Sequence, residues 1–163
     1  MHIEVFDKNT FTIYIYEKKK YKNINEIKEN PEKFFKKIFL ILKNKYKMNF
    51  EGLYKIEVYP CLIYGMIIEV KKEIDDFYEQ YIDGVDLKIK IHDESIMLYE
   101  IKDIFITKEI NNINLFKHKN KYYILANEEL TNKQLFKILE HSKIIYGEKC
   151  NQIINPYNLI TFE

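Results

Sequence analysis

The residue types that do most enzyme chemistry are few in this chain, and they are scattered along it. The 163 residues include four histidines and two cysteines, Cys61 and Cys150, and none of them shows the spacing of metal ligands. The segment His92-Asp93-Glu94-Ser95 brings a histidine, two acids and a hydroxyl together. Consecutive residues of one turn rarely converge on one substrate, so we expect a polar turn there and no catalytic residue.

The acidic residues Asp75, Asp76, Asp83 and Asp86 suggest cation binding at first sight. The order of acids before a glycine that marks a calcium loop is absent around Gly84, so we expect no metal site. The four glycines are dispersed and form no phosphate-binding cluster. We therefore expect no cofactor, and we do not expect an enzyme.

All 26 basic residues are lysine, which removes the bidentate fork that arginine offers to phosphate, guanine and carboxylate. The charge is uneven: residues 1–60 carry +5, residues 61–107 carry −6 and residues 108–163 carry +2, which gives the net charge of +1. A lysine-rich helix side and tyrosines such as Tyr14, Tyr16 and Tyr54 would suit single-stranded RNA. The near-neutral charge and the acidic middle make nucleic acid the weaker alternative.

Several features predict a soluble cytoplasmic protein. No apolar run approaches the roughly 20 residues that a membrane helix needs. The opening residues, MHIEVFDKNT, have neither the basic nor the apolar region of a signal peptide. Two cysteines without a disulfide-type pattern fit a reducing compartment.

The first part of the chain predicts strands around one helix. Apolar residues alternate with polar ones over residues 3–5, 11–15, 54–58 and 64–70, which is the period of half-buried strands, and Pro60 interrupts the third run. Between the two pairs of strands, Asn30 and Pro31 fit the N-cap and first position of a helix. Its predicted apolar stripe is Phe35, Ile38, Phe39, Leu42 and Tyr46, widened by Phe34 and Ile41, and we expect its end near Met48.

The second part repeats this mixture. Strands are predicted over residues 85–91, 96–101, 115–118 and 121–126, with residues 102–112 ambiguous. Thr131 to Gln134 forms a capping box that opens a second helix. We predict an α+β protein of two tandem units, each a mostly antiparallel sheet covered by one helix: residues 1–74 as a β-β-α-β-β unit, 75–83 as a short acidic connection and 84–163 as the second unit.

Between about Met1 and Ile74 the chain has, in order, the strand pair MHIEVFDKNTFTIYI, the helix ending near Met48-Asn49-Phe50, and EGLYKIEV followed by GMIIEVKKE. In these segments it resembles the MecA family, whose members are adaptors that deliver substrates to the ClpC unfoldase and act as negative regulators of competence. In the second half, IMLYEIKD, NLFKHKNKYYIL and Tyr146-Gly147 are similar to parts of the family's second domain. The family's long acidic linker is represented here by Glu73 to Gly84 at most.

The resemblance implies a non-enzymatic interaction protein, a compact adaptor between a client and a Clp ATPase. The alternatives are an inhibitor or immunity-type protein that blocks one macromolecule, and an RNA-binding module. A protein partner, such as a Clp ATPase N-domain or a client, is expected, and a homodimer is compatible with the sequence. The residues that we expect to contact a partner are Asp75, Asp76, Phe77, Tyr78, Asp83, Asp86, Phe116, Tyr122 and Tyr123.

Overall fold

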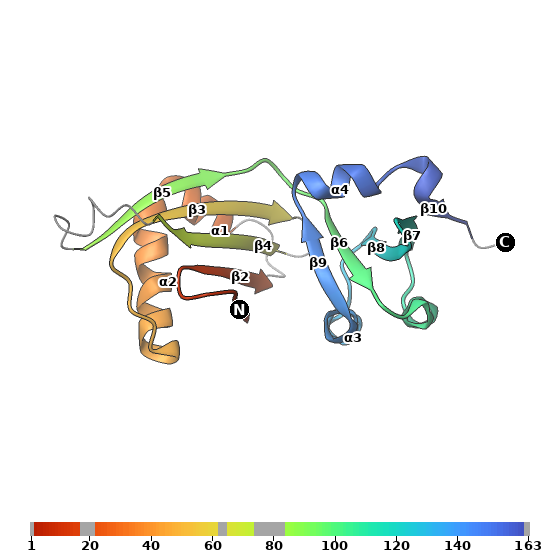
Figure 1. The fold of residues 1–163 in the computed structure, drawn as a ribbon, viewed down its shortest axis with the longest axis horizontal. Coiled ribbons are helices and arrows are strands. Elements are labelled where there is room, and N and C mark those ends of the chain that lie inside the picture. Colours follow the sequence, from red (N-terminus) through yellow and green to blue (C-terminus); the bar gives the residue numbers. More distant parts are fainter. Residues whose placement is uncertain (1, 17–21, 62–64, 74–83, 162–163) are drawn as a thin grey trace. The chain divides into compact units, whose positions relative to one another are not determined.

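The chain forms two units, each with its own five-stranded sheet (Figure 1). The computed structural model describes residues 2–16, 22–61, 65–73 and 84–161. The first unit comprises residues 1–60 and 65–93, and the second comprises residues 61–64 and 94–163. The α+β class predicted from the sequence is confirmed.

The first unit has five strands and two helices. In chain order they are β1 (His2–Val5), β2 (Thr10–Tyr16), α1 (Lys22–Glu29), α2 (Pro31–Tyr46), β3 (Gly52–Cys61), β4 (Gly65–Lys72) and β5 (Val85–Ile91). The sheet order is β1-β2-β4-β3-β5. Strand β2 pairs antiparallel with β1 and with β4, whereas β5 pairs parallel with β3, from Gly52 opposite Val85 to Val58 opposite Ile91.

Helix α2 starts and stops where the sequence predicts. The Lys33 backbone N–H donates to Asn30 Oδ1 over 3.1 Å, Pro31 occupies the first turn, and Lys47 ends the helix in the left-handed conformation at φ 57°. Its apolar stripe packs on the sheet because residues three and four apart share one helix face. Phe35 and Leu42 are fully buried there, in one core with Phe11, Ile56 and Ile68.

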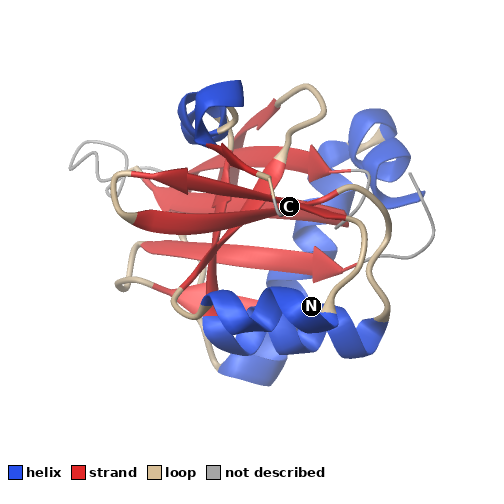
Figure 2. Ribbon diagram, turned by 90° about the vertical axis from the view of Figure 1, so that its right-hand side faces the viewer, coloured by secondary structure: helices blue, strands red, loops and turns tan. Residues whose placement is uncertain are grey.

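The second unit also packs helices against its sheet (Figures 1 and 2). Its elements are β6 (Met97–Ile101), the 3-10 helix η1 (Ile104–Glu109), β7 (Ile113–His118), β8 (Lys121–Ala126), α3 (Asn132–His141), β9 (Ser142–Tyr146), α4 (Glu148–Ile153), the 3-10 helix η2 (Pro156–Asn158) and β10 (Leu159–Ile160). The sheet order is β10-β7-β8-β6-β9, and every pairing in it is antiparallel. The predicted capping box of α3 is present, with Thr131 and Gln134 each bonded to the other's backbone N–H.

Three details of the prediction are wrong. The strand Val85–Ile91 completes the first sheet, so the units divide between Asp93 and Glu94, not within residues 75–83. Each unit also has two α-helices where one was expected, because α1 and α4 were not predicted. Finally, Pro60 lies within β3 instead of ending it.

We predict that Phe35→Ala lowers the free energy of unfolding by about 3–5 kcal/mol, because it leaves a cavity between α2 and the sheet. Urea unfolding followed by far-ultraviolet circular dichroism measures the change. Leu40→Ala is the matched control on the same helix: its side chain is 60 % exposed, so we expect a change within about 0.5 kcal/mol. Equal losses in the two variants would contradict the assignment of the buried face.

Candidate functional site

The predicted partner-contact residues have different positions in the structure. Asp75, Asp76, Phe77, Tyr78 and Asp83 lie outside the described residues. Asp86 is exposed on β5, on the side of the first sheet opposite the apolar core. Of the acidic residues that we expect to contact a partner, the structure therefore describes Asp86 alone.

The aromatic residues of the β7–β8 hairpin divide between the core and the surface. Phe116 and Tyr123 are 4 % and 5 % exposed and pack with Leu98 and Cys150 in the core of the second unit. They stabilise that unit and leave little side-chain area for a partner. Tyr122, on the other face, is half-buried, and Lys117 Nζ lies 5.6 Å from the centre of its ring.

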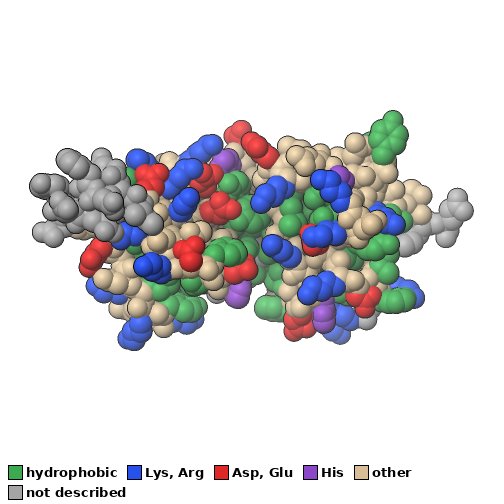
Figure 3. All heavy atoms as spheres, in the orientation of Figure 1, with side chains coloured by type: hydrophobic (Ala, Val, Ile, Leu, Met, Phe, Trp, Pro, Cys, Tyr) green, Lys and Arg blue, Asp and Glu red, His purple; other side chains and the backbone are tan. Residues whose placement is uncertain are grey.

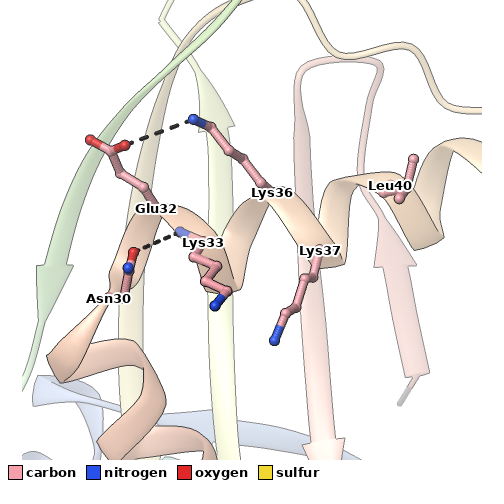
Figure 4. A pocket seen from close by; sticks show the side chains of 6 residues that line it. All are labelled: Asn30, Glu32, Lys33, Lys36, Lys37 and Leu40. Carbon is pink, nitrogen blue, oxygen red and sulfur yellow. Dashed lines mark hydrogen bonds and ion pairs between the residues drawn. The ribbon is translucent and has the colours of Figure 1, made fainter.

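The outer side of α2 carries a hollow that the sequence analysis did not single out. Its volume is about 460 Å³, and it is lined by Asn30, Glu32, Lys33, Lys36, Lys37 and Leu40. In Figure 4 the sheet lies behind the helix, so these side chains stand on the side away from the core. Lys36 points to Glu32 at 3.8 Å, while Lys33 and Lys37 extend together in another direction.

Large apolar side chains lie on this surface and beside it. Leu40 is 60 % exposed and its neighbour Ile41 46 %. Tyr46, in the last turn and on the side of the buried stripe, is 42 % exposed. The expectation that Ile41 and Tyr46 are buried in the apolar stripe is wrong for both. Leu40 lies outside that stripe, and an apolar residue at such a position is the signal that would have marked the surface.

In the second unit, η1 packs beside α3, and each of these elements has one exposed phenylalanine. Phe105 on η1 is 65 % exposed and Phe136 on α3 is 61 % exposed. Lys108 Nζ lies 4.8 Å from the centre of the Phe105 ring. Two large exposed apolar residues on packed elements make this part of the second unit a second candidate contact.

One polar network stands out on the first sheet. Glu57 on β3 accepts hydrogen bonds from Lys55 Nζ at 2.5 Å and Tyr59 Oη at 2.9 Å, and its Oε2 lies 2.9 Å from His92 Nε2. The Tyr59 and His92 rings stack at 4.3 Å. These contacts lower the pKa of Glu57 from 4.5 to about 2, the Lys55 hydrogen bond contributing most.

This network does not have the arrangement of a catalytic site. The Glu57 carboxylate is already bonded to three side chains, so it is a poor proton acceptor at neutral pH. His92 contacts this network, whereas the sequence grouped it with Asp93, Glu94 and Ser95. Over the described part of the chain, no group of three or more His, Cys, Asp or Glu side chains could hold a metal ion.

Charge on the visible face of the first unit is mixed. Figure 3 shows lysine and acidic side chains beside one another there, without a large area of one sign. Opposite charges also pair within this unit, as Lys88 Nζ and Glu73 Oε2 do at 2.8 Å. No described helix is long and apolar enough to span a bilayer.

We predict that neither cysteine reacts readily in the folded protein. Cys61 and Cys150 are both buried, and burial raises the pKa of the Cys150 thiol to about 11, so little thiolate forms at neutral pH. Titration with Ellman's reagent should label both thiols only after urea is added. Rapid labelling of Cys150 without denaturant would contradict the packing of α4.

We predict that Glu57 makes stability fall in acid. Its folded pKa of about 2 lies below the ordinary 4.5, so the stabilisation is complete above about pH 4.5 and is lost as the pH falls through 2. Urea midpoints between pH 6 and pH 2 should fall less steeply for Glu57→Gln than for wild type. Glu32→Gln, at an exposed position, serves as the control, and identical slopes for wild type and Glu57→Gln would exclude the network.

Similarity to known proteins adds no further guide to these surfaces. No protein-family model, no curated protein and no solved structure matches the chain.

Proposed function

We propose that this protein is a non-enzymatic interaction protein that works by binding other proteins through separate surfaces on its two units. The observation that carries the proposal is the exposure of large apolar side chains on two helical surfaces, at Leu40 and Ile41 in the first unit and at Phe105 and Phe136 in the second. Isolated exposed apolar residues are normal, but neighbouring ones on a stable element are typical of contact surfaces.

The two surfaces differ in their electrostatics. Three lysines line the hollow beside Leu40 on α2, whereas in the second unit Lys108 lies over the ring of Phe105. Different surfaces bind different partners, because a binder discriminates through its charges as well as its apolar contacts. A protein with two such units therefore suits the task of connecting two proteins.

More specifically, we propose that the protein is a compact adaptor of the MecA type, which holds a client with one unit and a Clp ATPase with the other. The first unit contains the strand, strand, helix and hairpin that the family resemblance implies, with α1 and β5 in addition. A Clp ATPase N-domain is accordingly the first partner to test. The cytoplasm, where such ATPases work, is the proposed location.

We predict that the immobilised N-domain of ClpC retains the purified protein at micromolar concentration. Phe105→Ser with Phe136→Ser should weaken retention if the second unit makes the contact, because both side chains lose apolar contact area. Tyr157→Ser is the matched control, since Tyr157 is 96 % exposed in the same unit. Absence of binding by wild type would exclude the Clp adaptor, and a stable complex with one unrelated macromolecule would favour the inhibitor alternative.

A further inference from the structure

The outer face of α2 combines positive charge with apolar area on one rigid element. The helix has five lysines and one glutamate, Glu32. Lys33, Lys36, Lys37 and Leu40 recur at spacings of three and four, so they line one side of the helix and one side of the hollow. Leu40 and its neighbour Ile41 place exposed apolar area beside these ammonium groups.

Carboxylates of a binding partner can replace the acidic side chains that these lysines contact within the protein. Lys37 Nζ pairs with Glu26 Oε1 at 2.6 Å, and Lys36 pairs with Glu32 at 3.8 Å, but the lysine side chains of both pairs are more than half exposed. Exposed ion pairs of this kind contribute little to the stability of the fold. Breaking them to form pairs with a partner therefore costs little free energy. Lys33 makes no ion pair with any residue that the structure describes.

The helix itself is firmly held, which favours specific docking. Its opposite side contributes Phe35, Ile38 and Leu42 to the core. The Asn30 cap and the left-handed Lys47 fix its two ends. A partner would therefore meet a preorganised surface and would lose little affinity to ordering of this helix.

We propose that the outer face of α2 docks an acidic amphipathic segment of a protein partner. The partner's carboxylates lie against Lys33, Lys36 and Lys37, and its apolar side chains cover Leu40 and Ile41. Charge complementarity selects an acidic partner, and the exposed apolar residues require that it also has an apolar face. A phosphate backbone would satisfy the lysines and leave Leu40 and Ile41 in water. This inference rests on the proposed interaction function and names one of its partners by chemistry.

The test uses the full chain and a labelled synthetic peptide of about 18 residues, five helical turns. The peptide has leucines at helical spacing on one face and glutamates on the other. Fluorescence anisotropy should show binding that weakens with salt, and by about tenfold or more in the triple variant Lys33→Glu, Lys36→Glu, Lys37→Glu. Leu40→Ser should weaken binding too, with an unchanged salt dependence.

The matched control reverses three exposed lysines of the second unit, Lys102→Glu, Lys133→Glu and Lys149→Glu, and should bind the peptide like wild type. Circular dichroism verifies that each variant is folded. A peptide of the same composition in scrambled order, which lacks the apolar face, should bind more weakly than the designed one. Equal binding of the two peptides, or equal weakening by the control variant, would overturn the proposal.

Two further probes separate this proposal from other ligands and from the proposed function. If single-stranded RNA or phosphatidylglycerol vesicles bind in an α2-dependent way while the peptide does not, the acidic protein partner is excluded. If the ClpC N-domain or a client binds the triple variant as well as wild type, the interaction function stands and the role of α2 is refuted. If peptide and proteins all fail to bind wild type, both proposals fail.

Discussion

The first unit depends on the packing of α2 against one face of its sheet. A helix buries one stripe of its surface, and here the stripe meets strand residues that alternate with period two. The rings of Phe39 and Phe50 stack at 4.5 Å, and Phe50 also contacts Phe11 at 5.9 Å, so the helix, the sheet and the segment between them share one aromatic cluster. This single contact decides which side of α2 faces water and therefore which residues a partner can reach.

Because one side of α2 is buried, its other side is the exposed one, and this side combines lysines with large apolar residues. Lysine keeps an exposed helix soluble, which explains five lysines on α2, but it does not explain Leu40 and Ile41. The same contrast appears in the second unit, where Ile138 of α3 is fully buried and Phe136 is exposed. Surfaces of this type are the reason for proposing a binding function. The polar network around Glu57, by comparison, is saturated by its own neighbours and has a structural role.

Much of the fold could be predicted because local patterns decide it. The caps at Asn30 and Thr131 and the alternation over β2, β3 and β4 each act within a few residues. The pairing of β5 with β3 could not be predicted in this way, because parallel partners are selected by contacts between segments that are distant in the sequence. Helix α1 could not be predicted because eight residues are too few for a helix that is stable by itself, and α1 gains stability from packing Ile27 into the core. The candidate surface on α2 could not be predicted as long as every apolar residue near the stripe was expected to be buried. The structure shows that Leu42 is buried and that Ile41 is exposed.

We propose that this protein acts by holding another protein. Affinity purification of the tagged chain from its source organism, with a tag-only control and quantitative mass spectrometry, tests the claim most directly. We expect one or two proteins to be recovered in amounts comparable to the bait, and their recovery to fall as salt is raised, because lysines contribute to the contact. Recovery of the bait alone, even after chemical cross-linking in the cell, would contradict it.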